Sequence, residues 1–264
     1  MSDQQAKTVL LIAPFQLEAF YRAVPFFIDF KEYYSETKAE VIVHPELLAL
    51  GKVFFPGLKI HTPQAQDLSN PFRLHKFCYN LLDVFNVDDC YCLDNSWKGI
   101  FMSFVFGSSR RIGFIKSWKR FALTDGIKVE EEPLQGDYVG LLTVGTGQVF
   151  SIKGLPPVNA DEVESIGDQH VFIDFNLGLI NSRMDLFKWV EFLNFFENQT
   201  FVMNIFGESS SLEVLAEELN SESRWILKDK LDEEEKIRLI QSSKGVISNN
   251  LATAFLSTYL NRKI

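Results

Sequence analysis

The chain has 264 residues, of which 46% are hydrophobic and 23% are charged, a composition typical of a globular protein and not of a disordered one. This length is enough for one large domain or for two ordinary ones. The net charge of −9 argues against a nucleic-acid partner, because such binding requires Lys and Arg to neutralise phosphates.

Strands and helices alternate along the first 150 residues. Thr8–Ala13 is a continuous apolar run, which indicates a buried strand. A Phe-rich helical stretch follows at 18–34, where Pro25 is expected to break or kink the helix. The other elements predicted in this half are strands at 39–44, 58–61, 89–94 and 111–114 and helices at 71–85 and 97–106. Such alternation predicts a mainly parallel sheet with right-handed crossovers.

The stretch 151–168, "SIKGLPPVNADEVESIGD", differs in composition from what precedes it. A Pro pair, two glycines and several acids are typical of a linker. Beyond it the alternation starts again, with strands at 170–175, 201–206 and 246–248 and helices at 185–196, 211–219, 231–242 and 251–260. The sequence therefore predicts an N-terminal αβ domain over 1–150, a linker over 151–168 and a second αβ domain over 169–264.

The three cysteines and the N-terminal residues indicate the cellular compartment of the protein. Cys78, Cys90 and Cys92 are an odd number and lack CxxC spacing, so neither a disulfide framework nor a metal site is expected. The opening residues "MSDQQAK" lack the pattern of a signal peptide, and the apolar runs are too short for a membrane span. A cytoplasmic protein is the resulting expectation.

The stretch Cys90–Phe114, "CYCLDNSWKGIFMSFVFGSSRRIGF", resembles glycosyltransferase family 9, the bacterial heptosyltransferases. The shared features are Asp94 at a strand end, Gly107 near a helix end and the closing "RRIGF". The segments Leu10–Pro25, "LLIAPFQLEAFYRAVP", and Ile247–Ile264, "ISNNLATAFLSTYLNRKI", also lie on patterns of this family without a gap. The resemblance therefore extends over both predicted domains.

This resemblance implies the GT-B fold, with two Rossmann-like αβα domains that have mainly parallel sheets. In the family the N-terminal domain binds the acceptor and the C-terminal domain binds the sugar nucleotide. The reaction moves a sugar, typically heptose from ADP-heptose, onto a hydroxyl of the lipopolysaccharide core. It needs a carboxylate to take the proton of the hydroxyl and cations or helix N–H groups to stabilise the departing diphosphate. The family pattern continues beyond the end of this sequence, so the second domain is expected to be incomplete.

In the first domain, the resemblance places the Gly-Asp pair of the family on Glu18 and Ala19. The Asp is the presumed base of the family, and Ala19 cannot take a proton. Glu18, one position earlier, is therefore the candidate base, with an N-terminal helix residue favoured by the helix dipole as the alternative reading. Asp94 is expected to cap the turn before the helix at Trp97 and not to act as a base.

In the second domain, the resemblance gives three candidate donor-binding residues. Arg183 is the best substitute for the Lys with which the family meets the diphosphate, and Lys188 is the second choice. Gly207 is retained at a turn that touches the nucleotide, but the following Glu208 would repel a diphosphate. Asn250 takes the place of the Asp in the Asp-Ser-Gly motif of the family, so that turn keeps its packing and loses its charge.

Three functions remain open from the sequence. The first is a catalytically inactive heptosyltransferase-like fold reused as a binding or scaffold module, with no cofactor. The second is an active but divergent glycosyltransferase that uses Glu18 and Arg183 with a nucleotide-sugar such as ADP-heptose. The third is a regulator that senses a nucleotide without turning it over. An incomplete second domain would expose apolar surface, so a protein partner or self-association through the C-terminal domain is also expected.

Overall fold

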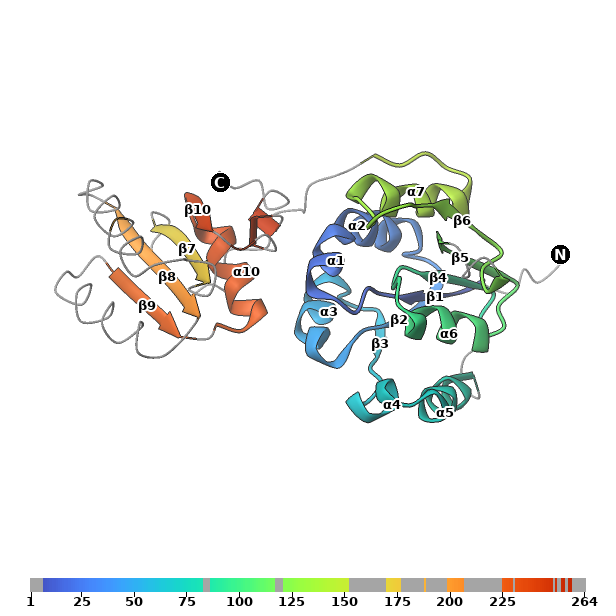
Figure 1. The fold of residues 1–264 in the computed structure, drawn as a ribbon. Helices are drawn as coiled ribbons and strands as arrows, with labels where there is room; N and C mark the ends of the chain where they lie inside the picture. The colour runs from blue at the N-terminus through green and yellow to red at the C-terminus, as the bar shows by residue number, and fades with distance from the viewer. Residues whose placement is uncertain are drawn as a thin grey trace. The chain divides into compact units, whose positions relative to one another are not determined.

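The computed structural model describes residues 7–82, 86–116, 121–151, 170–176, 188, 199–206, 225–229, 231–248, 250, 253–254 and 256–257. The chain divides into two compact units, Met1–Lys153 and Gly154–Ile264 (Figure 1). Each unit is built on its own parallel sheet, which confirms the predicted α/β fold with two Rossmann-like domains.

The first unit has a six-stranded sheet in which every neighbouring pair is parallel. Its order is β3-β2-β1-β4-β5-β6. The strands are β1 (Thr8–Ile12), β2 (Lys38–Ile42), β3 (Lys59–His61), β4 (Asp89–Cys92), β5 (Arg110–Ile115) and β6 (Asp125–Lys128). The strand order reverses between β1 and β4, and the crevice outside the carboxyl ends of these strands is where such sheets bind ligands.

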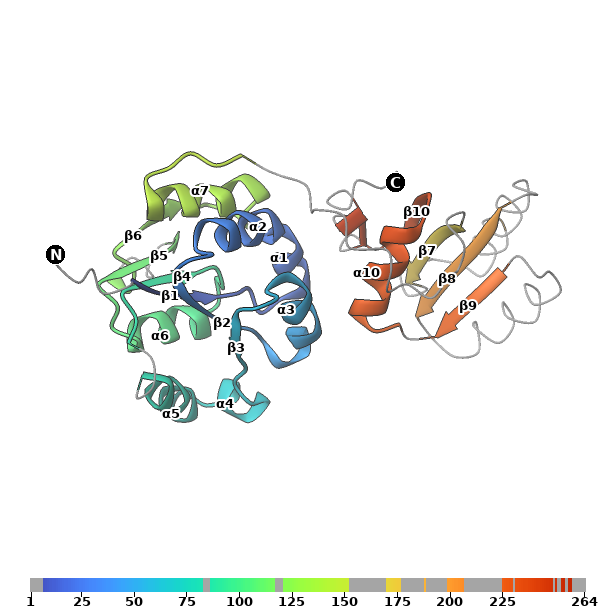
Figure 2. The same cartoon turned by 180° about the vertical axis from the view of Figure 1, so that it is seen from behind.

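Helices cover both faces of this sheet (Figures 1 and 2). On one face lie α1 (Leu17–Arg22), α2 (Val24–Tyr33), α3 (Leu48–Phe54) and α7 (Gln135–Thr146), and α2 packs on α7. On the other face lies α6 (Trp97–Val105), against which α5 (Pro71–Leu82) packs, and α4 (Ala65–Ser69) packs on α5. A short 3₁₀ turn, Pro45–Leu47, precedes α3.

The two faces have different cores. Tilted and edge-on Phe rings from α1, α2 and the end of α3 fill the first, including Phe20, Phe27 and Phe55. Aliphatic residues of β1 and β2 with α5 and α6 fill the second, which also holds the buried thiols Cys78 and Cys90. Burial raises the pKa of Cys78 to about 12, so this thiol stays protonated and acts as an apolar residue.

Pro25 ends one helix and begins another. The predicted helical stretch 18–34 is divided at Ala23 into α1 and α2, and Pro25 lies in the first turn of α2. Proline is tolerated there because the first N–H groups of a helix have no intrahelical partner. The break predicted at this proline is confirmed.

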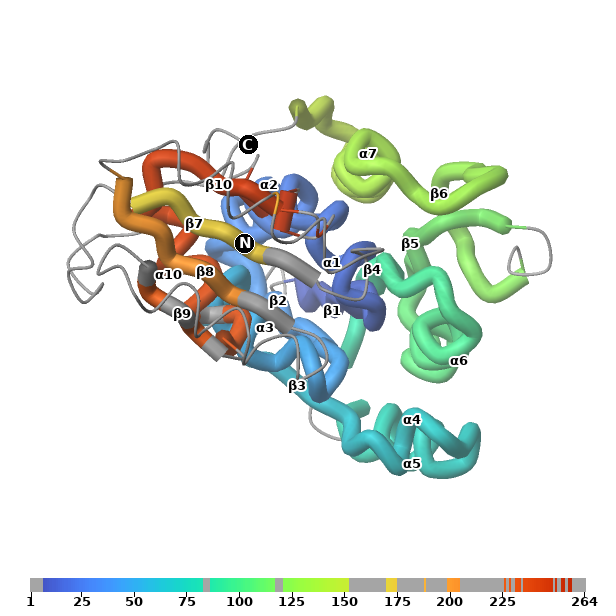
Figure 3. Tube along the Cα trace, turned by 60° about the vertical axis from the view of Figure 1, so that its left-hand side comes forward, coloured from blue at the N-terminus to red at the C-terminus, as the bar shows by residue number. Residues whose placement is uncertain are grey.

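The second unit has a four-stranded parallel sheet of order β10-β7-β8-β9 (Figure 3). Its strands are β7 (His170–Asn176), β8 (Thr200–Phe206), β9 (Trp225–Asp229) and β10 (Gly245–Ser248), and α10 (Glu233–Ser242) packs on β7. The helices predicted at 185–196 and 211–219 lie outside the described residues, apart from a helical Lys188. The predicted linker also lies outside them, apart from Ser151.

Candidate functional site

Three loops meet at the carboxyl edge of the first sheet, where the resemblance places the acceptor side. The loop after β1 carries Phe15, the loop after β2 carries His44, and the loop after β4 carries Asp94. The rings of Phe15 and His44 lie with their centroids 5.3 Å apart, and the Phe15 N–H donates to Asp94. Three loops that are distant in the sequence therefore meet at this edge.

Asp94 is buried and fully engaged by hydrogen-bond donors. Its Oδ1 accepts the Phe15 N–H at 3.2 Å, and its Oδ2 accepts the Gly99 N–H at 3.1 Å and the Ser96 hydroxyl. Ser96 is the N-cap of α6, so the two side chains share the free N–H groups of that helix start. Burial raises the pKa of Asp94, although these donors act in the opposite direction. The predicted capping role is confirmed.

Glu18 lies on the surface, in the first turn of α1. Its carboxylate is 3.5 Å from the Arg22 guanidinium one helical turn later, and Arg22 also lies 3.8 Å from Glu132. The side chain of Glu18 is 57% exposed. This position in the first turn agrees with the alternative interpretation, in which Glu18 interacts favourably with the helix dipole. The carboxylate also forms an i, i+4 ion pair with a cation of its own helix.

His44 is a residue at this edge that the sequence did not single out. Its Nδ1 accepts the Glu46 N–H at 3.4 Å, and its side chain is 19% exposed. Burial lowers the pKa of His44, so the imidazole is neutral near pH 7 and can exchange hydrogen bonds or accept a proton. The available signal was a histidine at the last position of the strand predicted at 39–44.

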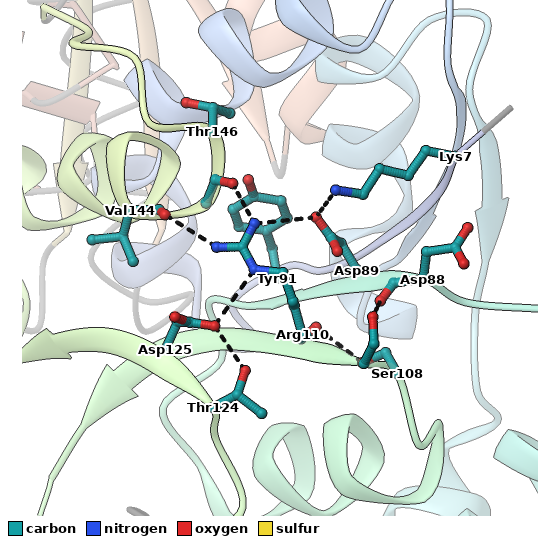
Figure 4. Close-up of polar contacts among 12 residues, drawn as sticks. Lys7, Asp88, Asp89, Tyr91, Ser108, Arg110, Thr124, Asp125, Val144 and Thr146 are labelled. Atoms are coloured by element: carbon teal, nitrogen blue, oxygen red, sulfur yellow. Dashed lines mark hydrogen bonds and ion pairs between the residues drawn. The ribbon is translucent and has the colours of Figure 1, made fainter. Parts of the chain in front are cut away.

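The "RRIGF" motif begins with Arg110 at the opposite, amino edge of the sheet and continues along β5 (Figure 4). Arg110 begins β5 and donates to the carbonyl oxygens of Gly145 at 2.7 Å and Val144 at 3.3 Å, in the last turn of α7. Its guanidinium also lies 3.5 Å from Asp125 and 3.9 Å from the buried Asp89. A cation at the carboxyl end of a helix, paired with two acids, stabilises the fold and does not face a ligand site.

The rest of the motif serves packing as well. Arg111 donates to the Ala122 carbonyl and to the Ser108 carbonyl, both at 2.7 Å. A side chain at Gly113 would place its Cβ 2.9 Å from the Cys92 carbonyl oxygen, so only glycine fits between β4 and β5 there. The motif on which the family resemblance mainly depends therefore holds strands and helix together.

The second unit contains a buried polar cluster that the sequence did not reveal. Asp174, in β7, is fully buried and accepts the Asn204 side-chain amide at 2.6 Å and the Thr253 hydroxyl. The Lys236 ammonium, 4% exposed on α10, lies 3.1 Å from the same carboxylate. The Ser248 hydroxyl donates to the Asp174 carbonyl oxygen at 2.9 Å. The Asp174 carboxylate thus connects β7 and β8 with two helical segments, and the carbonyl oxygen of the same residue adds β10.

The registers of the sheet explain this cluster. Ser248, Asp174, Asn204 and Lys228 are successive partners across β10, β7, β8 and β9, so they form one row on one face. Because α10 supplies Lys236 to Asp174, this row lies under that helix. A buried ion pair of this kind is retained only when hydrogen bonds satisfy it, as they do here.

The predicted donor-binding residues are only partly described. Arg183 and Gly207 lie outside the described residues. Lys188 is exposed in a helical segment, and the Asn250 N–H donates to the Ser248 hydroxyl at 2.9 Å. The described parts of the chain contain no group of three His, Cys, Asp or Glu side chains suited to a metal ion. In the same parts, no helix is both long and apolar enough to cross a membrane.

Comparison with known proteins identifies the fold. The structure of a glycosyltransferase of family 9 from Veillonella parvula is 12% identical, with a TM-score of 0.71 over 97% of this chain and 78% of that chain. The E. coli ADP-heptose lipopolysaccharide heptosyltransferase II is 14% identical, with a TM-score of 0.69 over 97% of this chain and 82% of that chain. A UDP-GlcNAc 2-epimerase from Methanocaldococcus jannaschii is 11% identical, with a TM-score of 0.60 over 97% and 82%.

No protein-family model and no curated protein sequence matches the chain. The protein therefore has the GT-B-like fold of the family 9 heptosyltransferases, as the sequence resemblance implied. At these identities the likeness establishes a fold, and the same fold is shared with proteins named as epimerases, so the function must come from the residues of the site.

Proposed function

We propose that this protein is a heptosyltransferase-like fold that does not transfer sugar and acts in the cytoplasm as a binding module. The main support for the proposal is that the carboxylates at the carboxyl edge of the first unit are already bonded to other groups of the protein. Asp94 is buried beneath three donors, and Glu18 is paired with Arg22 on the outside of α1. The position at which the family resemblance places the base is Ala19, which has no proton acceptor.

The second unit supports the same conclusion. Asn250 replaces the acid of the motif that the resemblance places there, and its N–H is used within the turn by Ser248. Asp174 does not replace that acid, because it is fully buried against Lys236, Asn204 and Thr253. In this proposal, the N-terminal unit descends from an acceptor-type domain and the C-terminal unit from a donor-type domain.

The size of the expected loss can be bounded. A general base contributes roughly 10²–10⁴-fold to a rate, and one donor that stabilises developing charge contributes about 10²–10³-fold. Such contributions are not additive, but losing both leaves little above the uncatalysed rate. Turnover would require Glu18 to leave Arg22 and Arg183 to meet the diphosphate.

The decisive assay is release of nucleotide from ADP-heptose and related donors in the presence of a lipopolysaccharide core acceptor. The parent chain should give no turnover above background. Turnover that disappears in Glu18→Gln or Arg183→Ala would overturn the proposal and establish the divergent enzyme. A His44→Gln variant belongs in the same series, because turnover lost only there would identify a base that the family does not predict.

Binding is tested separately by isothermal titration with ADP, UDP and their sugars. A nucleotide that binds without being turned over would replace the scaffold proposal by a nucleotide-sensing regulator. Size-exclusion chromatography with light scattering tests the predicted self-association, and a truncated chain lacking 169–264 tests whether the C-terminal unit mediates it.

A further inference from the structure

The well-exposed large apolar side chains in the described part of the chain all belong to the first unit, and α5 carries two of them. Phe72 is 86% exposed and Tyr79 is 57% exposed. The opposite side of the helix is an ordinary packing face, on which Leu74, Cys78 and Leu81 are buried. The aromatic residues are therefore not part of the core that this helix completes.

The outer face of α5 is also cationic. Arg73 and Lys76 are exposed cations between the two aromatic residues, and the exposed His75 ring stacks on Tyr79 with a centroid distance of 6.3 Å. Neither α5 nor α6, on which it packs, contains an acid, although the whole chain has a net charge of −9. The positive charge of this helix therefore contrasts with the rest of the molecule.

The helix is placed where a surface can reach it. Figures 1 and 2 show α4 and α5 at the margin of the first unit, beyond α6 and on the side of the sheet away from α7. Phe72 and Tyr79 are seven residues apart, which separates them by about 10 Å along the helix axis. Arg73 uses one guanidinium N–H on Gln66 at 2.7 Å, and Lys76 has no anionic partner among the described residues.

We infer that the outer face of α5 docks on an anionic lipid surface. Aromatic rings and cations mixed on one exposed helical face suit the boundary between headgroups and acyl chains, where rings enter the boundary and cations meet phosphates. An acidic protein partner fits less well, because protein interfaces bury aromatic anchors as a central cluster. On α5 the two rings are separated along the axis, with cations between them.

The charge of the chain limits the strength of this contact. An overall charge of −9 repels an anionic bilayer, but exposed charges beyond about 8–10 Å are largely screened at physiological salt. The local cations of α5 then dominate. The expected association is weak and reversible, and it depends on the anionic lipid content.

The test is flotation of the full chain with vesicles of pure phosphatidylcholine and with vesicles that also contain phosphatidylglycerol. We expect association with the second kind only, and a decrease as salt is raised. Lys76→Glu removes one attraction and adds one repulsion, so the partition coefficient should fall about 30-fold. Phe72→Ser combined with Tyr79→Ser should lower it at least about tenfold, because the apolar contribution is lost.

Matched controls lie elsewhere on the same unit. Lys128→Glu changes an exposed lysine of β6, and Phe104→Ser changes a 55% exposed ring of α6, so neither should alter partitioning by more than about twofold. Circular dichroism checks that every variant is folded. Absence of binding by the parent chain would overturn the inference, and so would equal loss in the control variants. Binding that does not depend on the anionic lipid content would also overturn it, since the cations would then have no role.

Discussion

Asp94 offers the sharpest test of the local structure at the carboxyl edge. Asp94→Asn keeps the size of the side chain but exchanges one acceptor oxygen for an amide donor. Because Phe15 N–H, Gly99 N–H and the Ser96 hydroxyl all donate to the carboxylate, the amide must face at least one N–H group. A buried N–H that loses its acceptor costs about 1–3 kcal/mol, and this is the destabilisation expected of the variant.

The cost should depend on pH with a definite sign. Burial raises the pKa of Asp94 in the folded protein above its value in the unfolded chain. The folded state therefore holds this proton more tightly, and the contribution of Asp94 to stability is greatest at low pH. It falls as pH rises from the unfolded pKa through the folded pKa. The Asn side chain does not titrate. The difference in free energy of unfolding between the parent and Asp94→Asn should therefore be largest at low pH and should decrease as pH rises.

The measurement is urea denaturation followed by circular dichroism between about pH 4 and pH 8, the range in which a raised carboxyl pKa is expressed. Hydrogen exchange of peptides from 89–105 assigns the change to the first unit, since a chain with two units need not unfold in one step. Glu131→Gln is the control, because Glu131 is an exposed carboxylate in a loop. Equal stability of parent and Asp94→Asn across this range would refute the hydrogen-bond network.

Two further predictions concern packing. In α7, Gly145→Ala would place a Cβ 1.9 Å from the Tyr91 hydroxyl, so it should lower the free energy of unfolding by about 1–3 kcal/mol in urea denaturation. The control in the same helix is Gly136→Ala, whose Cβ meets no atom within 4 Å, so it should raise that free energy by up to about 1 kcal/mol. In the second unit, Lys236→Met should cost about 3–5 kcal/mol, followed by hydrogen exchange at 199–206, because it leaves Asp174 as an uncompensated buried charge. Adding Asp174→Leu should recover part of that loss: it removes the charge but leaves the Asn204 amide and the Thr253 hydroxyl without their acceptor. Equal stability of the two α7 variants, or a double variant no better than Lys236→Met alone, would contradict these expectations.

Most strands of both sheets could be predicted because they are continuous apolar runs, but β6 (Asp125–Lys128) and β9 (Trp225–Asp229) were not predicted. β1, β4, β7 and β8 fall within the predicted ranges to a residue or two at each end. The restart of alternation after the linker also predicted two sheets and not one. Buried parallel strands need apolar side chains on both faces, so they leave a signal that needs no knowledge of tertiary contacts.

The helix α7 could not be predicted in the same way. Its sequence, "QGDYVGLLTVGT", contains three glycines, which are poor helix formers, and an unpatterned mixture of polar and apolar residues. Its stability comes from partners elsewhere in the chain. Gly145 makes room for the Tyr91 hydroxyl, and Arg110 binds the carbonyl oxygens of the last turn. These contacts appear only once β4 and β5 lie beneath the helix.

The polar cluster of the second unit was hidden for a related reason. Asp174 lies within the apolar run "HVFIDF", and Lys236 lies in a helix rich in charged residues. Neither position stands out alone, because a single acid in a strand or a lysine on a charged helix is common. Only the register of β7 with β8 and β10, and the packing of α10, bring the two charges to 3.1 Å.

The two edges of the first sheet explain why the sequence was more informative about fold than about function. The motif that carries the resemblance begins at Arg110, at the amino edge, where it binds Gly145 and pairs with Asp125. Parallel sheets bind ligands at the other edge, so the contacts of Arg110 do not depend on which residues occupy the ligand site. At that other edge, the position that the resemblance assigns to the base is Ala19, and the Asp94 carboxylate is occupied by N–H and hydroxyl donors. Burial lowers the pKa of His44 at the same edge. The contacts that Arg110 makes therefore support the fold, and the reaction has to be tested at the carboxyl edge.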